Sequence, residues 1–211
     1  MSDQQNDRDE TAGKTVAAGF ERPSLPKRFF KVVTVEDEGG QVAILLDGRP
    51  VQTPGKAPLA VPSAALAEAV ADEWRAQGDR IDPQTMPLTR LVNSAIDGVL
   101  GQEAAVVDDI LAHAGSDLLC DRARGPEGRL SLQAEAWDPV LYWAAGALAA
   151  PLSLAEGVMH VPQPETSLES LRAAIEPLDP LKLAALHVMT TLTGSALLPL
   201  AVARGELSPE A

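Results

Sequence analysis

The chain has 211 residues, with 17 Lys and Arg against 30 Asp and Glu, and therefore a formal net charge of -13 at pH 7. Because nucleic acids and anionic membranes attract basic surfaces, this charge argues against both as main partners. The single cysteine, Cys120, excludes an intrachain disulfide framework, and no apolar run reaches the roughly 18 residues of a membrane span.

The first 21 residues are polar and acidic, with Asp3, Asp7, Asp9 and Glu10 among them. This composition predicts a disordered tail over residues 1–21, because it offers too little apolar surface to bury. It has neither the apolar core of a signal peptide nor the arginines of a transit peptide. We therefore expect a soluble protein of the cytoplasm.

Residues 22–62 have the composition of a small antiparallel β-sheet domain. The segment that begins at Arg28 is rich in aromatic and β-branched residues, which favour strands. Asp47 and Gly48 form a strong hairpin signal, because both central residues of the preferred two-residue turn need positive φ. The expected strands are Arg28–Val35, Gln41–Leu46, Arg49–Thr53 and Leu59–Val61.

Residues 63–99 are predicted to form a junction of two helices joined by a stiff, proline-containing linker. The hydroxyl of Ser63 can cap the first helix, and Gly78 suits the left-handed residue that ends a helix. Trp74 closes an apolar face at helical spacing and is therefore expected in the core. The second helix is expected to begin near Thr89.

Residues 100–211 show helical periodicity almost throughout and predict a larger α-helical bundle, so the fold class is α+β. Helix starts are indicated by Thr166 with Glu169, which have capping-box spacing, and by Asp179 before a proline. Segment 152–161 is either a short strand or irregular. The expected helices span 102–113, 130–148, 166–176 and 180–193, with Val188 and Leu192 on the core face of the last one.

Two local signals leave alternatives open. Asp138 before Pro139 either starts a new helix or kinks a continuous one. Ser208, Pro209 and Glu210 have the form of a helix start. They are either a frayed tail or the beginning of a terminal helix that this chain lacks.

Side chains that could support catalysis are few. His113 and Asp117 lie four residues apart and could share one helix face as metal ligands, with Cys120 close by. Because a metal site needs three or four ligands, this metal-dependent or hydrolytic enzyme is a weaker hypothesis than a helix-end histidine beside a solvated acid. His187, in an apolar helix, is expected to be a hydrogen-bonded core histidine. We predict no cofactor and no metal.

Charged residues near the junction are candidates for binding a protein partner. Asp72 and Glu73 beside Trp74 form either an acidic, aromatic patch for a basic partner or solvated acids around a buried tryptophan. Arg49, after the hairpin turn, either pairs with a carboxylate of the helical domain or is free for a partner. Without a catalytic constellation, the residues favour a binding protein.

Several blocks of this sequence, in their order and spacing, resemble the ATP12 family of assembly chaperones for the F1 sector of ATP synthase. No single block is diagnostic, but together they cover nearly everything after the N-terminal tail. The blocks are Arg28–Lys31, Leu46–Pro54, Leu59–Pro62, Glu73–Trp74 with Gln77–Gly78, Met86–Leu91, Asn93–Asp97, Asp117–Cys120 with Arg122–Ala123, Gln133 and Trp137–Pro139.

The resemblance implies a non-enzymatic chaperone that binds the free α subunit of F1. Such a chaperone would shield the α surface that faces the β subunit, because a large exposed apolar interface aggregates unless something covers it. Release needs only that β binds more tightly. The tail fits a bacterial, cytoplasmic member, whereas eukaryotic members work in mitochondria. We expect the protein to be monomeric when free.

The family pattern also directs attention to Arg90 and Asp97, which lie in two of its blocks. With Arg49, Asp72 and Glu73 they complete the candidate partner-binding residues. The sequence departs from the pattern at Asp121, where the family usually has an aromatic residue, which affects local packing. The pattern also continues past this chain with a further helix that carries acidic residues and a Trp-Gly pair.

Overall fold

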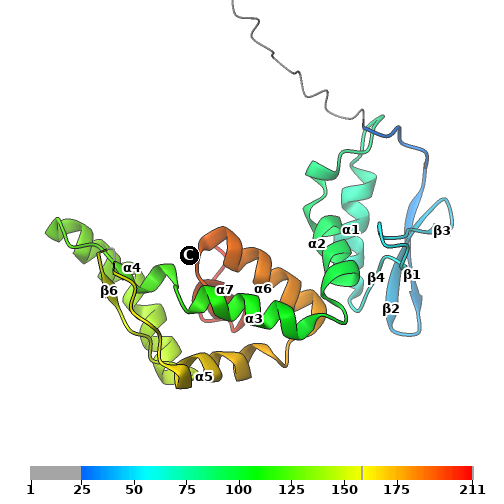
Figure 1. Cartoon of the computed structure of the whole chain (residues 1–211). Helices are drawn as coiled ribbons and strands as arrows, with labels where there is room; N and C mark the ends of the chain where they lie inside the picture. Colours follow the sequence, from blue (N-terminus) through cyan, green and yellow to red (C-terminus); the bar gives the residue numbers. More distant parts are fainter. Residues whose placement is uncertain (1–24, 158, 211) are drawn as a thin grey trace, which may run out of the picture.

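The computed structural model describes residues 25–157 and 159–210, so the tail expected over residues 1–21 lies outside the described part. A small antiparallel sheet lies at one end of the molecule and a group of helices at the other (Figure 1). This arrangement confirms the predicted α+β fold. No helix in the described part of the chain is both long enough and apolar enough to cross a membrane.

The sheet has four strands, and β2 is its centre. β2 pairs with β1 along its whole length on one side and with β3 and β4 on the other, always antiparallel. At the hairpin turn Asp47 and Gly48 have φ values of 49° and 77°, as the two-residue turn requires. The strands are β1 (Val33–Glu38), β2 (Gln41–Leu46), β3 (Arg49–Pro50) and β4 (Ala60–Val61).

Three predicted strands differ from the observed ones at their ends, the last of them, Leu59–Val61, by one residue. The first begins at Val33 rather than Arg28, because the backbone before it is held by other partners: Arg28 N donates to Asp79 O, and Lys31 N donates to the carboxylate of Asp47. The third strand ends at Pro50; beyond it Val51 N still donates to Ile44 O of β2, and Gln52 forms only an isolated bridge with Pro58.

Helix α1 (Ala64–Arg75) begins as predicted, with the Ser63 hydroxyl accepting from Leu66 N at 3.4 Å. Its end differs, because Gly78 does not adopt the left-handed conformation. The buried side chain of Gln77 instead joins the end of α1 to the linker, donating to Glu73 O and accepting from Asp82 N.

The linker contains a short 3-10 helix, η1 (Pro83–Thr85), and leads to α2 (Pro87–Ser94). Helix α2 begins two residues before the predicted start at Thr89, because proline is well tolerated in the first turn. It continues directly into η2 (Ala95–Val99), a turn of π-helix.

Helices fill the rest of the chain, as predicted. Pro139 lies inside α4, which continues through it. Of the two alternatives for segment 152–161, the short strand is the one observed, as β6. The capping box of Thr166 and Glu169 does not form, because α5 begins one residue earlier, after Pro164. The elements are α3 (Glu103–Ala114), η3 (Leu118–Cys120), β5 (Asp121–Arg122), α4 (Glu127–Ala147), β6 (Ala155–Glu156), α5 (Glu165–Ile175), α6 (Pro180–Thr193) and α7 (Leu197–Ala203).

The described residues form two hydrophobic cores. The sheet packs against α1 and α2 around Ile44, Leu59 and Val70, while the helices from α3 onward share a second core around Ile110 and Leu183. Two residues of η2, Ala95 and Val99, are buried in the second core. The α2–η2 segment therefore joins the two halves.

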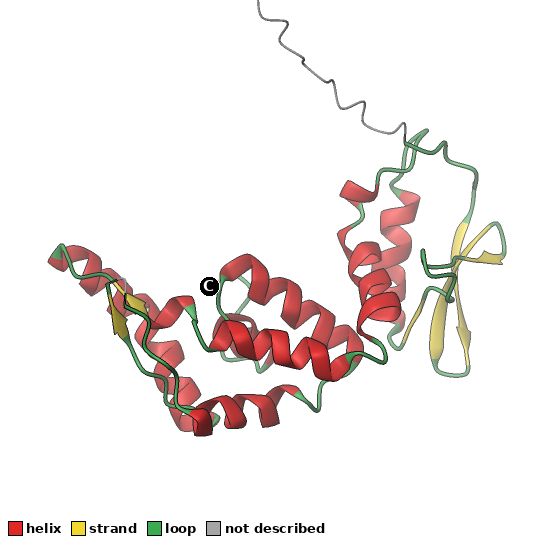
Figure 2. Ribbon diagram, in the orientation of Figure 1, coloured by secondary structure: helices red, strands yellow, loops and turns green. Residues whose placement is uncertain are grey.

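The side of the molecule farthest from the sheet is formed by α4 and the parallel strands β5 and β6 (Figures 1 and 2). Only Val140 and Ala144 of α4 are buried, so the first half of this helix is largely exposed. Arg122 of β5 holds the helix in place, through an ion pair with Asp138 at 2.7 Å and a cation–π interaction with Trp137, whose ring centroid lies 5.4 Å from its Cζ.

Candidate partner-binding site

The carboxylate of Glu73 forms hydrogen bonds within this protein and is not free for a partner. It accepts hydrogen bonds from Leu88 N at 2.7 Å and from Thr89 N and Oγ1 at 2.8 and 2.7 Å. These amides belong to the first turn of α2 and have no partner within their own helix, so Glu73 caps α2 from the neighbouring helix.

Asp97 also forms internal hydrogen bonds. It accepts from Thr53 Oγ1 at 2.6 Å and from Gly55 N at 2.8 Å, which fixes the loop after β3 against η2. A Cβ atom at position 55 would lie 2.6 Å from Asp97 Oδ1, so this close approach requires glycine.

The other three candidates are exposed but differ in their surroundings. Asp72 forms an ion pair with Arg75 at 2.7 Å on the outer face of α1, and the hydrogen bonds that Arg75 donates to Glu68 and Asp72 raise the pKa of Arg75. Arg90 lies exposed on α2. Arg49 is one of the residues that line a pocket in the sheet half.

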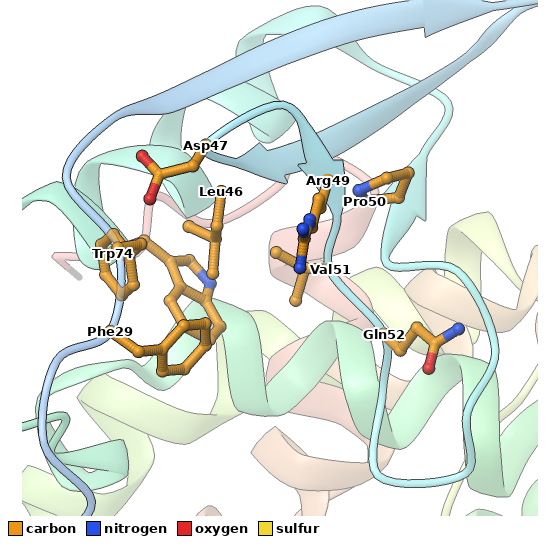
Figure 3. Close-up of a pocket in the computed structure, with 9 residues that line it drawn as sticks. Phe29, Leu46, Asp47, Arg49, Pro50, Val51, Gln52 and Trp74 are labelled. Carbon is orange, nitrogen blue, oxygen red and sulfur yellow. The ribbon is translucent and has the colours of Figure 1, made fainter.

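This sheet pocket has a volume of about 550 Å³ and is formed by the segment before β1, the β2–β3 turn and α1 (Figure 3). Phe29, Asp47 and Trp74 line one side, while Pro50 and Gln52 lie on the other. The structure therefore places Arg49 in a cavity with mostly apolar walls, and it brings none of the other four candidates there.

Trp74 is only half-buried, although its helical spacing predicted a core residue. Its ring packs edge-on against Phe30 with ring centroids 5.7 Å apart, and its other side faces the pocket. The next aromatic residue, Phe29, is 73% exposed. The sequence did not single out Phe29, because it belongs to an expected strand in which both neighbouring aromatics looked equally suited to the core.

Two residues of α6 that were predicted to lie in the core are exposed. Leu192 is 80% exposed and Val188 is also exposed, because the core of this helix is formed by Leu183 and Leu186 on another face. His187 is hydrogen-bonded as predicted, but at the surface rather than in the core: its Nε2 lies 2.6 Å from a carboxylate oxygen of Asp109 on α3.

The three residues of the enzyme hypothesis do not form a metal or catalytic cluster. Asp117 is fully buried rather than solvated, and its carboxylate accepts from the backbone nitrogens of Leu119 and Ala196. His113 Nδ1 lies 2.9 Å from the backbone oxygen of Asp109, one turn earlier. Cys120 is buried, and burial raises the pKa of its thiol to about 12. In residues 25–157 and 159–210, no three His, Cys, Asp or Glu are placed to hold one metal ion.

Asp117 has a structural role instead. By accepting hydrogen bonds at the starts of η3 and α7 it joins two segments that are far apart in the sequence. Burial nevertheless raises the pKa of this carboxyl group, against the lowering effect of hydrogen bonds from Ser195, Leu119, Leu197 and Ala196.

Comparisons with known proteins agree with this fold. Residues 27–145, more than half of the chain, match the model of the ATP12 chaperone protein family. The crystal structure of Atp12 from Paracoccus denitrificans has 49% sequence identity and a TM-score of 0.81 over 86% of this chain and 78% of that one. The structure of the Atu1473 protein from Agrobacterium tumefaciens has 51% identity and a TM-score of 0.84 over 88% and 70% of the two chains. The chain belongs to the ATP12 chaperone family.

Proposed function

We propose that this protein assists assembly of the F1 sector of ATP synthase by binding the free α subunit. It covers the α surface that later meets the β subunit and leaves when β arrives. Membership of the ATP12 chaperone family supports the chaperone role. The choice of the α subunit follows from the resemblance of the sequence blocks, from Arg28 through Pro139, to chaperones of that subunit.

The observation that carries the proposal is a set of large apolar side chains left in solvent on the helical half. Each is more than two thirds exposed, and together they lie on α4, after β6 and on α6. Such side chains are unfavourable in water unless a partner covers them, and binding surfaces commonly contain them. They are Leu132 at 68%, Tyr142 at 73%, Met159 at 69% and Leu192 at 80%.

Release needs no chemical step in this proposal. If β contacts the same α surface over a larger area, the chaperone is displaced because the αβ pair has the lower free energy. The protein then acts without catalysis or cofactor, as a monomer in the cytoplasm, and its net charge of -13 keeps it soluble while its apolar side chains are free.

Coexpression with the α subunit of the same organism tests the proposal. Size-exclusion chromatography should give a complex of chaperone and α, and the soluble fraction of α should increase. Coexpression with β is the matched control and should give neither result. If α neither forms a complex nor gains solubility, the proposal is wrong.

A second measurement separates a chaperone from a permanent subunit. Addition of β to the purified complex should release this chain and leave α with β. The chain should also be absent from the assembled ATP synthase. Its stoichiometric presence there would identify a structural subunit instead.

A further inference from the structure

Phe29 is exposed on a segment whose backbone is hydrogen-bonded on both sides of it. Neighbouring backbone nitrogens anchor the segment on both sides of it: Arg28 N donates to Asp79 O at 2.9 Å, and Lys31 N donates to Asp47 Oδ1 at 3.1 Å. The ring packs edge-on against Phe30, which is buried. An exposed aromatic side chain on an anchored backbone can bind a partner without the cost of ordering that backbone.

The two charged residues of the pocket differ in whether they are free to bind a partner. The carboxylate of Asp47 is already engaged, since it accepts from Val32 N at 2.8 Å and from Lys31 N, and these hydrogen bonds lower its pKa. The guanidinium group of Arg49 has no hydrogen bond or ion pair with any residue that the structure describes. The pocket thus presents apolar walls and one available cation.

These two features define what the pocket fits. A volume of about 550 Å³ accommodates a large apolar side chain together with part of its backbone. Arginine forms bidentate hydrogen bonds with carboxylates, and tryptophan and arginine are enriched among the residues that dominate binding energy. Arg49 is the basic residue among those that line the pocket, and its charge favours an acidic group in the occupant.

We propose that the sheet pocket is a second contact site for the chaperoned F1 subunit, in addition to the exposed apolar side chains of the helical half. It receives an apolar side chain of that subunit between Phe29 and Trp74, while a neighbouring Asp or Glu of the subunit pairs with Arg49. This proposal rests on the proposed function, because the occupant is a segment of the bound α subunit.

Affinity measurements with the intact α subunit test the pocket directly. Phe29→Ala and Arg49→Glu should each weaken binding by about tenfold or more, as expected for residues that dominate an interface. Both side chains are exposed, so the variants should unfold at the parent's temperature. Lys56→Glu is the matched control, because it makes the same charge change in the same half, away from the pocket lining, and should leave binding unchanged.

Photo-crosslinking identifies the occupant. With p-benzoylphenylalanine at position 29, ultraviolet light should join the chain to a segment of α that contains an apolar residue near an Asp or Glu. The same amino acid at Val32, which is exposed outside the pocket lining, should crosslink far less. Crosslinks from position 29 to a second copy, or to the chain's own first 24 residues, would overturn the proposal.

The two proposals fail in different ways. If the parent forms the α complex while Phe29→Ala and Arg49→Glu bind equally well, the pocket proposal is wrong and the chaperone proposal stands. If the parent does not bind α at all, both are wrong.

Discussion

The carboxylate of Asp117 accepts a hydrogen bond from the backbone nitrogen of Ala196 at 2.8 Å, across 79 residues of sequence. A second oxygen of the same group accepts from Leu119 N at 3.0 Å. One buried carboxylate therefore caps the N-terminal ends of both η3 and α7. The position of α7 thus depends on a side chain from a distant segment.

The first prediction concerns the pH dependence of stability at Asp117. Burial raises its pKa above the ordinary value of 3.8, so the folded state holds this proton more tightly than the unfolded state. The contribution of Asp117 to the free energy of unfolding is therefore fully present below pH 3.8 and is lost as pH rises through the folded pKa.

The variant Asp117→Asn cannot titrate at this position and is the reference. We expect the parent's stability relative to this variant to increase as the solution is taken from about pH 8 to about pH 4, measured by urea unfolding at each pH. All other titrating groups are common to the two proteins and cancel in the difference. A constant difference, or one that shrinks toward low pH, would contradict the raised pKa.

The second prediction concerns the cap of α2. Replacing Glu73 with Gln removes the charge that accepts from Leu88 N and Thr89 N, so we expect a loss of about 1–2 kcal/mol in the free energy of unfolding. Asp72→Asn is the control on the neighbouring residue: its ion pair with Arg75 is exposed, so the loss should stay below about 0.5 kcal/mol. Equal effects in the two variants would show that Glu73 is not a structural cap.

Local sequence signals predicted the elements well and the contacts between them poorly. The turn at Asp47 and Gly48, the cap at Ser63 and the cap at Asp179 all lie within a few residues of the backbone groups they serve, and all formed as predicted. The cap of α2 by Glu73 joins different helices, and no local spacing encodes such a contact.

In the candidate site, too, the sequence predicted local features but not the contacts between segments. Arg49 was identified from its place after a hairpin turn, but its apolar surroundings come from three separate segments. Phe29 was missed because adjacent residues of an extended chain point to opposite faces. Composition cannot decide which of Phe29 and Phe30 enters the core, and here the core contains Phe30.

The third prediction tests the close approach of Gly55 and Asp97. Gly55→Ala should destabilise the protein by about 1–3 kcal/mol, because the new methyl group meets Asp97 Oδ1 at 2.6 Å. Asp97→Ala should also destabilise it, by removing the hydrogen bonds to Thr53 and Gly55. The double variant should lose less than the sum of the two, because the clash needs both side chains. Additive losses in thermal unfolding would contradict this direct contact.

The fourth prediction concerns the reactivity of Cys120. The thiol is buried, and burial with the nearby charges of Asp117 and Asp121 raises its pKa to about 12. Since the thiolate is the reactive form, iodoacetamide should modify the folded protein very slowly at neutral pH and the urea-unfolded protein quickly. Mass spectrometry of the time course measures both rates. Rapid modification of the folded protein would show that this thiol is accessible and reactive.

The fifth prediction separates stability from binding on one helix. Leu192 is 80% exposed on α6, so Leu192→Ala should change the free energy of unfolding by less than about 0.5 kcal/mol. Leu186, on the same helix, is buried, and Leu186→Ala should lose about 2–5 kcal/mol because it leaves a cavity. If the exposed apolar face of α6 binds the α subunit, only Leu192→Ala weakens binding while it leaves the melting temperature unchanged. Unchanged affinity in that variant would remove α6 from the proposed interface, which would then consist of the exposed side chains around α4 and the sheet pocket.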